Sequence, residues 1–308
     1  MGQVFEIILP ARVDVNFITT FIRIMNSFYR YDNAQLPGVI LSFSNVKCID
    51  ILGILILYKF LEYSILMNCF INPTTIDIKN INPKIKEYGF DSLIASCYND
   101  SKKMEEEYNR LQSRVTNKFL VSPISIFKGL VDRETIERKC FNSISQFYGI
   151  GEVSDMVFMV ISELIGNFYS HSKDESRSII VACGTKEYVE IACADSGTGI
   201  IESLRPYVSS RDDSRILKKA FQKGVSSKPG TDHMGYGLWM LGETVKKNNG
   251  RLIAYSQGTY YERFGGRENV ISAPLWKGTI IYLKLFTKCP ITVKDILPVN
   301  KDSKINFR

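Results

Sequence analysis

Residues 163–172 read ELIGNFYSHS and place Glu163, Asn167 and His171 four residues apart in an otherwise apolar run. Positions three or four residues apart share one face of a helix, so these side chains form a stripe together with Ser170. A buried carboxylate without a partner is energetically costly. We therefore expect this stripe to be the wall of a site that water or a cation reaches.

Two glycine-containing turns follow this stretch in the chain. The motif DSGTGI ends a strand pattern, and its Gly197 and Gly199 let the backbone turn tightly after Asp195 and approach a flat ligand. The motif HMGYGLWML places Gly235 and Gly237 just before a helix pattern. Because the first N–H groups of a helix are free and its dipole is positive there, this second turn suits phosphate groups.

Each of these motifs is common when it stands alone. In this order they resemble the ATPase domain of the GHKL family, which DNA gyrase, Hsp90-type chaperones, histidine kinases and MutL share. The resemblance covers residues 132–286. It rests on ExxxNxxxH at Glu163, Asn167 and His171, on DSGTG at 195–199, on GYGL at 235–238, and on the pair Gly278 and Thr279. It implies an α/β fold, a two-layer α/β sandwich with a mixed sheet, that binds ATP.

The resemblance also implies roles for four side chains. Asn167 matches the ligand of Mg²⁺, a role that suits a hard amide oxygen. Glu163 matches the residue that polarises the attacking water or an acceptor hydroxyl. Asp195 matches the carboxylate that accepts a hydrogen bond from the adenine amino group, and Thr279 matches the residue that supports this contact through water.

Further matches concern the backbone and the phosphates. Backbone contacts to adenine and the phosphates are implied for Gly197, Gly199, Gly235 and Gly237. Residues 200–234 are polar and weakly periodic, as expected of a lid over the site. Lys228 in this lid matches lysines that reach the terminal phosphate in some relatives. We expect His171 to orient the helix end or neighbouring phosphates.

The chain divides into four expected segments. Strand and helix patterns alternate over residues 1–97, which predicts a smaller α/β domain. Residues 98–131 carry a charged stretch and then a segment with a proline and no sustained period, so we expect a linker. The ATP-binding domain is expected at 132–287 and a C-terminal tail at 288–308.

The first domain resembles the STAS fold of anti-sigma-factor antagonists. The resemblance is carried by GVILSFSNVKCIDILGILIL, which combines strand, loop and helix patterns, and by the later EYGFDSLI. The loop of that family commonly reads DSSG and contains a serine that a partner kinase phosphorylates. Here the loop reads Asp50, Ile51, Leu52, Gly53, without that serine. We therefore expect a fixed docking or dimerisation module, which implies a protein partner and leaves a homodimer open.

Composition narrows the class of protein. The net charge of +7 is spread along the 308 residues, so we expect no nucleic-acid partner. The most apolar run is interrupted by Lys59 and Glu62 and is too short to span a bilayer, and the start of the chain lacks a secretion signal. Seven cysteines without a CxxC pair fit reduced thiols. We expect a cytoplasmic protein without a membrane partner.

Three functions fit these features. The first is an ATP- and Mg²⁺-dependent conformational switch that controls a protein partner, with possible slow ATP hydrolysis. The second is a serine/threonine protein kinase of the anti-sigma-factor type, and the third is a non-catalytic nucleotide-binding scaffold. Both histidines, His171 and His233, lie inside the ATPase domain, so we do not expect autophosphorylation on histidine.

Overall fold

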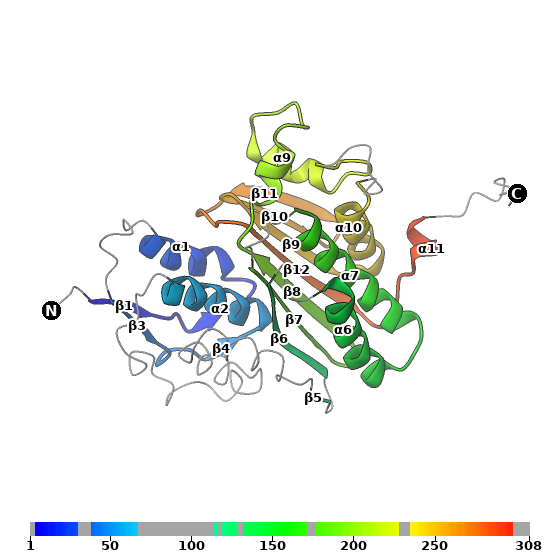
Figure 1. Cartoon of the computed structure of the whole chain (residues 1–308), viewed down its shortest axis with the longest axis horizontal. Helices are drawn as coiled ribbons and strands as arrows, with labels where there is room; N and C mark the ends of the chain where they lie inside the picture. The colour runs from blue at the N-terminus through cyan, green and yellow to red at the C-terminus, as the bar shows by residue number, and fades with distance from the viewer. Residues whose placement is uncertain are drawn as a thin grey trace, which may run out of the picture.

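A computed structural model describes residues 4–29, 38–66, 114–115, 119–127, 132–171, 177–227 and 235–297. Its centre is an eight-stranded sheet with the strand order β11-β10-β9-β12-β8-β7-β6-β5 (Figure 1). The strands are β5 (Arg114–Val115), β6 (Phe119–Phe127), β7 (Arg177–Gly184), β8 (Tyr188–Asp195), β9 (Arg251–Ser256), β10 (Thr259–Phe264), β11 (Arg267–Ser272) and β12 (Thr279–Phe286).

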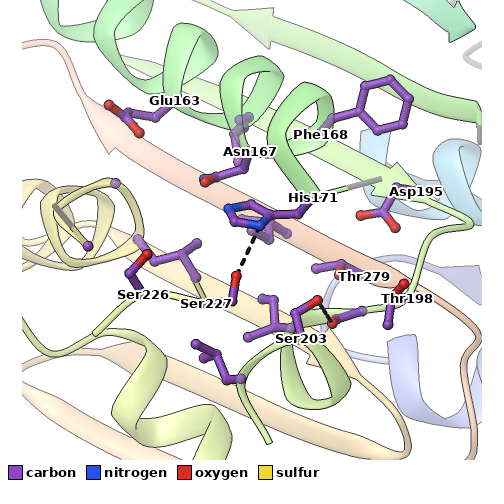
Figure 2. Close-up of a pocket in the computed structure, with 18 of the residues that line it drawn as sticks. Glu163, Asn167, Phe168, His171, Asp195, Thr198, Ser203, Ser226, Ser227 and Thr279 are labelled. Carbon is purple, nitrogen blue, oxygen red and sulfur yellow. Dashed lines mark hydrogen bonds between the residues drawn. The ribbon is translucent and has the colours of Figure 1, made fainter. Parts of the chain in front are cut away.

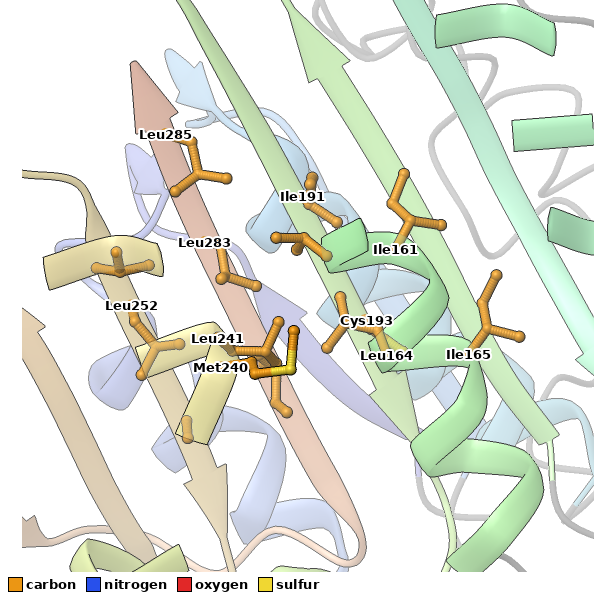
Figure 3. Close-up of a cluster of buried hydrophobic side chains, with 14 of the residues drawn as sticks. Ile161, Leu164, Ile165, Ile191, Cys193, Met240, Leu241, Leu252, Leu283 and Leu285 are labelled. Atoms are coloured by element: carbon orange, nitrogen blue, oxygen red, sulfur yellow. The ribbon is translucent and has the colours of Figure 1, made fainter. Parts of the chain in front are cut away.

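Helices cover one face of this sheet, as expected for an α/β sandwich (Figure 1). They are α6 (Arg133–Tyr148), α7 (Glu152–His171) and α10 (Gly237–Asn248). Asp132 caps α6, because its side chain accepts a hydrogen bond from the N–H of Thr135 at 2.8 Å. Apolar side chains of α7 and α10 pack on alternate residues of β8 and β12 (Figure 3). This core holds α7 with its polar stripe away from the sheet.

The N-terminal elements form two small parallel pairs and two helices. Strand β1 (Val4–Ile8) pairs with β3 (Gly38–Ser42), and β2 (Arg12–Val13) pairs with β4 (Cys48–Ile49). The helices are α1 (Ile18–Tyr29) and α2 (Ile51–Leu66). The loop before α2 is ordered by Asp50, whose carboxylate accepts hydrogen bonds from the N–H groups of Gly53 and Val15 at 2.9 and 2.7 Å.

Helix α2 packs against β7 and β8 on the face of the sheet opposite to α7. Ala192 and Ala194 of β8 share a core with the N-terminal helices, whereas Ile191 and Cys193 of the same strand face α7 and α10. Since side chains alternate between the two faces of a strand, both faces of β8 are buried. The N-terminal elements therefore add a third layer to the α/β sandwich.

Two details of the predicted architecture are corrected. The sheet was expected to be mixed, but every pairing within the eight-stranded sheet is antiparallel. The prediction of a linker at residues 98–131 is also wrong in part, because Phe119–Phe127 within it forms β6 and pairs with β7. The register shifts between Val121 and Ile124, where Pro123 has no N–H to donate. A strand that accommodates a proline at a bulge lacks the regular pattern by which it is recognised.

The segment 200–234 contains more regular structure than its sequence pattern indicates. Its described part forms α8 (Ile200–Leu204) and α9 (Asp213–Ala220). Within the expected tail at 288–308, α11 (Val293–Ile296) is helical, and Ile296 is buried in the same core as α7. The second stretch that resembles STAS, EYGFDSLI, lies outside the described residues.

Two further observations concern membranes and thiols. Among the helices that the structure describes, none has both the length and the apolar character needed to cross a bilayer. Of the seven cysteines, the five in the described ranges are free thiols. Burial raises the pKa of the Cys140 and Cys193 thiols to about 12, which keeps both protonated at neutral pH.

Candidate functional site

A cavity of about 240 Å³ lies between α7, the ends of β8 and β12, the N-terminus of α10 and the segment around α8 (Figure 2). One wall is the stripe on α7, formed by Glu163, Asn167 and His171. This wall exists because α7 buries its other face, which includes Ile161 and Ile165, against the sheet. The cavity therefore has a polar wall on α7, and apolar side chains such as Leu164 and Ile281 line it as well.

The amide of Asn167 is placed where it could hold a ligand. Within the described part of the chain, its Nδ2 atom is buried and has no hydrogen-bond partner. Such an orphaned polar group in a native fold calls for an explanation, and a bound ion, water or ligand is a common one. A half-turn of the amide exchanges its oxygen and its nitrogen, so either atom can be turned toward the cavity.

The N-terminus of α10 approaches this amide closely. A Cβ atom added at Gly237 would lie 2.5 Å from Oε2 of Glu163 and 3.5 Å from Oδ1 of Asn167. Glycine at this position thus lets the first turn of α10 touch the stripe on α7. The free N–H groups of that turn, together with the positive end of the helix dipole, form a site for anions beside two oxygen-bearing side chains.

The floor of the cavity carries the carboxylate of Asp195, at the end of β8. Its Oδ1 accepts a hydrogen bond from the N–H of Gly197 at 2.7 Å, and the sheet register places Thr279 of β12 directly beside it. Burial raises the pKa of Asp195, while the Gly197 hydrogen bond, the charge of Lys59 and the Thr279 hydroxyl oppose that rise. Lys59 belongs to α2 and is only 4% exposed, so the N-terminal layer contributes a positive charge to this carboxylate.

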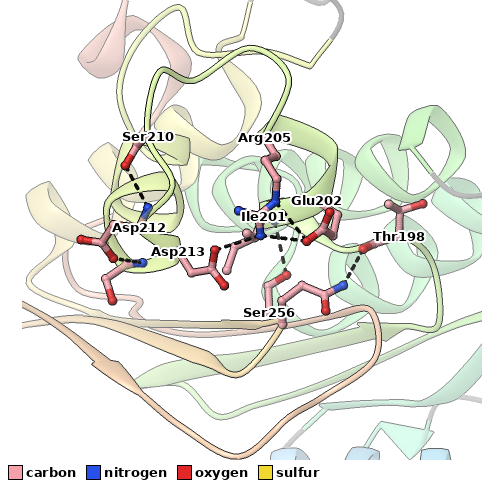
Figure 4. Close-up of polar contacts among 10 residues, drawn as sticks. Thr198, Ile201, Glu202, Arg205, Ser210, Asp212, Asp213 and Ser256 are labelled. Carbon is pink, nitrogen blue, oxygen red and sulfur yellow. Dashed lines mark hydrogen bonds and ion pairs between the residues drawn. The ribbon is translucent and has the colours of Figure 1, made fainter.

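The segment that begins at α8 and borders the cavity is fixed at its base by ion pairs (Figure 4). Arg205 at the end of α8 contacts Oε1 of Glu202 at 2.8 Å and Oδ1 of Asp213 at 2.9 Å, which joins α8 to α9. The side chain of Gln257 donates to the carbonyl of Thr198 at 2.9 Å, which ties the start of the segment to the end of β9. The base of this segment is therefore anchored to the sheet.

The described far end of the segment reaches α7. The hydroxyl of Ser227 lies 3.1 Å from Nδ1 of His171, the last residue of α7 (Figure 2). The N–H of Gly224 donates to the carbonyl of Gly235 at 3.2 Å. This bond joins the residues that follow α9 to those that precede α10. The cavity is thus bordered by both ends of the segment between α9 and α10.

Most of the predicted site residues come together in this cavity. Its lining includes Glu163, Asn167, His171, Asp195, Gly199, Gly235, Gly237 and Thr279. Gly197 does not line it, but its N–H holds Asp195. Lys228 lies outside the described residues, so its place in the site stays a prediction.

Several further lining residues were not predicted as site residues, although Thr198, Tyr236 and Leu238 lie inside the motifs singled out in the sequence. They are Leu164, Phe168, Cys193, Thr198, Ile200, Ser203, Leu204, Val225, Ser226, Ser227, Tyr236, Leu238 and Ile281. For Cys193 a signal existed, because the alternation of β8 puts it on the same face as Asp195 two residues later. The hydroxyl groups of Ser203 and Ser227 belong to a weakly periodic segment, where no pattern indicates which way they point.

Comparison with known protein families identifies the type of domain that contains the cavity. A family model described as "Histidine kinase-, DNA gyrase B-, and HSP90-like ATPase" matches residues 152–287. No curated protein and no solved structure matches the chain. The matched range begins at the first residue of α7, leaves out α6 and the N-terminal layer, and contains every residue that lines the cavity.

Proposed function

Because residues 152–287 form an ATPase domain of the histidine kinase, DNA gyrase B and HSP90 type, we propose that the chain binds ATP with Mg²⁺ in this cavity and acts as an ATP-dependent switch for a protein partner. One observation carries the proposal. The cavity has a fixed hydrogen-bond acceptor, Asp195, at its floor, and an anion site beside Asn167 at the start of α10. A ligand with a flat ring that donates a hydrogen bond to Asp195, and with phosphates that occupy the anion site beside Asn167, would match both features.

Asp195 supports the choice of adenine as the base. An ionised carboxylate can only accept hydrogen bonds, and the exocyclic amino group of adenine can only donate them. Guanine presents a carbonyl oxygen at the corresponding position, which would face the carboxylate as a second acceptor. The apolar side chains of Ile281 and Leu204 line the same cavity and offer surfaces for the flat ring.

The residues at the other end fit a magnesium ion bound with phosphates. Mg²⁺ prefers hard oxygen ligands and usually keeps several waters and phosphate oxygens. The amide oxygen of Asn167 is such a ligand, and the unpartnered state of its amide nitrogen is consistent with a group that completes its contacts only with a ligand bound. When bound, the ion would neutralise charge on the phosphates. Glu163 lies one helical turn before Asn167, where its carboxylate can orient an attacking oxygen and accept its proton.

The proposed switch is the segment from α8 to Ser227. It contacts the cavity at both ends, and it touches α7 through the hydrogen bond between Ser227 and His171. Phosphates at the end of the cavity beside Asn167 would change the contacts of this segment. They would either replace the hydrogen bond between Ser227 and His171 or form additional bonds to the same residues. ATP would thereby change the surface that this segment presents to a partner.

For residues 1–97 we propose a STAS-like docking or dimerisation module. The described part contains a strand, β3, a loop held by Asp50, and a long apolar helix, α2. Through the packing of α2 on β8 and the charge of Lys59, this module touches the strand that carries Asp195. A partner or a second copy bound to it would therefore act on the floor of the cavity.

The second candidate function is a serine/threonine kinase. It is favoured by the same position of Glu163, because a carboxylate that orients water can equally orient the hydroxyl of a protein substrate. The two functions use one binding mode and differ in the acceptor of the phosphoryl group.

Two measurements test the proposal and separate the candidates. ATP with Mg²⁺ should raise the unfolding temperature of the chain, and GTP should do so much less. Labelled ATP should then yield free phosphate for the switch, or labelled partner protein for the kinase. Stabilisation without either product would indicate a scaffold, and no stabilisation by ATP would refute the proposal.

A matched pair of variants tests the role of Glu163. Glu163→Gln keeps the shape of the side chain, so ATP should still stabilise the protein while turnover falls by about 10²-fold or more. Glu187→Gln changes an exposed carboxylate in the turn between β7 and β8 that does not line the cavity, and it should leave turnover unchanged. Equal turnover in Glu163→Gln and the wild type would exclude the role.

A further inference from the structure

The end of α7 and the segment after α9 bring a hydroxyl and an imidazole together inside the cavity. Ser227 Oγ lies 3.1 Å from His171 Nδ1, although the two residues are 56 positions apart in the chain. Both line the cavity, on the same side as Asn167 (Figure 2). His171 is fixed by a 20-residue helix, which presents its ring to the serine.

This arrangement has the features of an activated nucleophile. A serine hydroxyl is a weak nucleophile at neutral pH, and it is usually activated by a neighbouring base within hydrogen-bond distance. An unprotonated Nδ1 of His171 can accept the hydroxyl proton if the ring carries its own proton on Nε2. Phosphoryl transfer depends mainly on the position of the acceptor and on stabilisation of charge.

Two other hydroxyls of the cavity, those of Ser203 and Thr279, are placed differently. Ser203 donates to the carbonyl of Gly199 in its own helix at 2.7 Å, so its proton is directed away from the cavity. Thr279 lies beside Asp195 at the opposite end, where adenine is proposed to bind. The hydroxyl of Ser227, by contrast, lies within hydrogen-bond distance of an imidazole nitrogen.

We propose that Ser227 is an intramolecular acceptor for the terminal phosphoryl group of ATP, with His171 as the base. The inference rests on the proposed function, since it requires ATP with its phosphates beside Asn167. The oxygen of Ser227 forms a bond to the γ-phosphorus, and the bond from this phosphorus to the β,γ-bridging oxygen breaks. ADP leaves with that electron pair, and the hydroxyl proton passes to Nδ1 of His171.

The product would regulate the site in which it forms. A phosphoserine carries roughly −1.5 to −2 charges at neutral pH. At Ser227 this charge would lie beside the protonated His171 and near the positive end of α10, so it would hold the segment against α7. It would also repel the phosphates of a second ATP. Phosphorylated protein should therefore gain less stability from ATP than unphosphorylated protein.

The test uses the full chain with ATP and Mg²⁺, and it reads binding and transfer separately. Thermal stabilisation by ATP reports binding, and mass spectrometry of the intact protein and its peptides reports the number and place of phosphoryl groups. We expect one group on Ser227, which appears at a rate independent of protein concentration. Ser227→Ala should lose the modification and keep the stabilisation, whereas Ser227→Thr should restore it.

Two further variants complete the design. His171→Gln should slow the modification by about 10²-fold or more, and Ser145→Ala, in α6 and outside the cavity, should leave it unchanged. In nucleotide-free protein, the ¹⁵N shifts of the His171 ring should show an unprotonated Nδ1 that changes in Ser227→Ala. The chain has only one other histidine, His233, which simplifies the assignment.

Specific outcomes would overturn the inference. If ATP stabilises the protein but no phosphoryl group appears, or if it appears on another residue, Ser227 is not the acceptor and the proposed ATP binding stands. An unchanged rate in His171→Gln would remove His171 as the base. If ATP fails to stabilise any variant, the proposed function itself fails, and the inference fails with it.

Discussion

Replacing Gly278 by alanine should damage both the fold and the adenine end of the cavity. Gly278 immediately precedes β12 and has a φ of +97°, a conformation that costs a residue with a side chain about 1–2 kcal/mol. An added Cβ would lie 2.9 Å from the carbonyl carbon of Asp195 and closer still to its oxygen. Relief of such overpacking typically costs about 1–3 kcal/mol. The total loss in the free energy of unfolding should be about 2–5 kcal/mol.

The assay is urea denaturation of the wild type, Gly278→Ala and a matched control. Gly266 also has a positive φ, +74°, but a Cβ atom there would have no atom within 4 Å. The unfolding free energy of Gly266→Ala should therefore fall only by the cost of the positive φ, about 1–2 kcal/mol, with no loss from overpacking. Gly278→Ala should in addition lose stabilisation by ATP, because it displaces the backbone of Asp195. Equal losses of stability in the two variants, with ATP binding intact in both, would refute this reasoning.

Three other perturbations test the N-terminal layer and the face of the sheet that it covers. Burial raises the pKa of Asp50 to about 7. Between about pH 4 and pH 7 the folded state therefore binds more protons than the unfolded state, and the folded state loses stability as the pH rises. Over this range the unfolding free energy of the wild type should fall by about 1.4 kcal/mol per pH unit relative to that of Asp50→Asn. Parallel pH profiles in urea denaturation would contradict this. Tyr282→Phe should cost about 1.5–3 kcal/mol in the same assay, because it removes the 2.5 Å hydrogen bond to Glu190, and unchanged stability would argue against that bond. Leu57→Ala, at a fully buried position in α2, should cost about 2–5 kcal/mol, and a loss below about 1 kcal/mol would mean that α2 does not pack on the sheet.

Local patterns were enough to predict much of the ATPase domain. The helical spacing of Glu163, Asn167 and His171 placed them on one face of α7, and the alternation of β8 placed Asp195 at the end of a buried strand. These features depend on neighbours a few residues away, which the sequence displays directly.

Features that depend on distant segments could not be predicted in this way. Strand β6 was missed because Pro123 interrupts its pattern, and only pairing with β7 makes it a strand. Nothing in the sequence indicates that α2 covers the second face of β8, or that Ser227 meets His171 across 56 residues. The mixed sheet was expected only from the family resemblance. The direction of a strand depends on which strands lie beside it in the sheet, and local patterns do not show this.

The central claim, that this cavity binds ATP through Asp195, is tested most directly by the unfolding temperature of the wild type and Asp195→Asn with ATP and Mg²⁺. Asparagine can still accept the hydrogen bond from Gly197, but its second atom becomes a donor that faces the adenine amino group. At an ATP concentration of about 100 times the dissociation constant, binding should add about 2.7 kcal/mol to the stability of the wild type. The account predicts a clear rise in unfolding temperature for the wild type and none for Asp195→Asn. An equal rise in both proteins would contradict it.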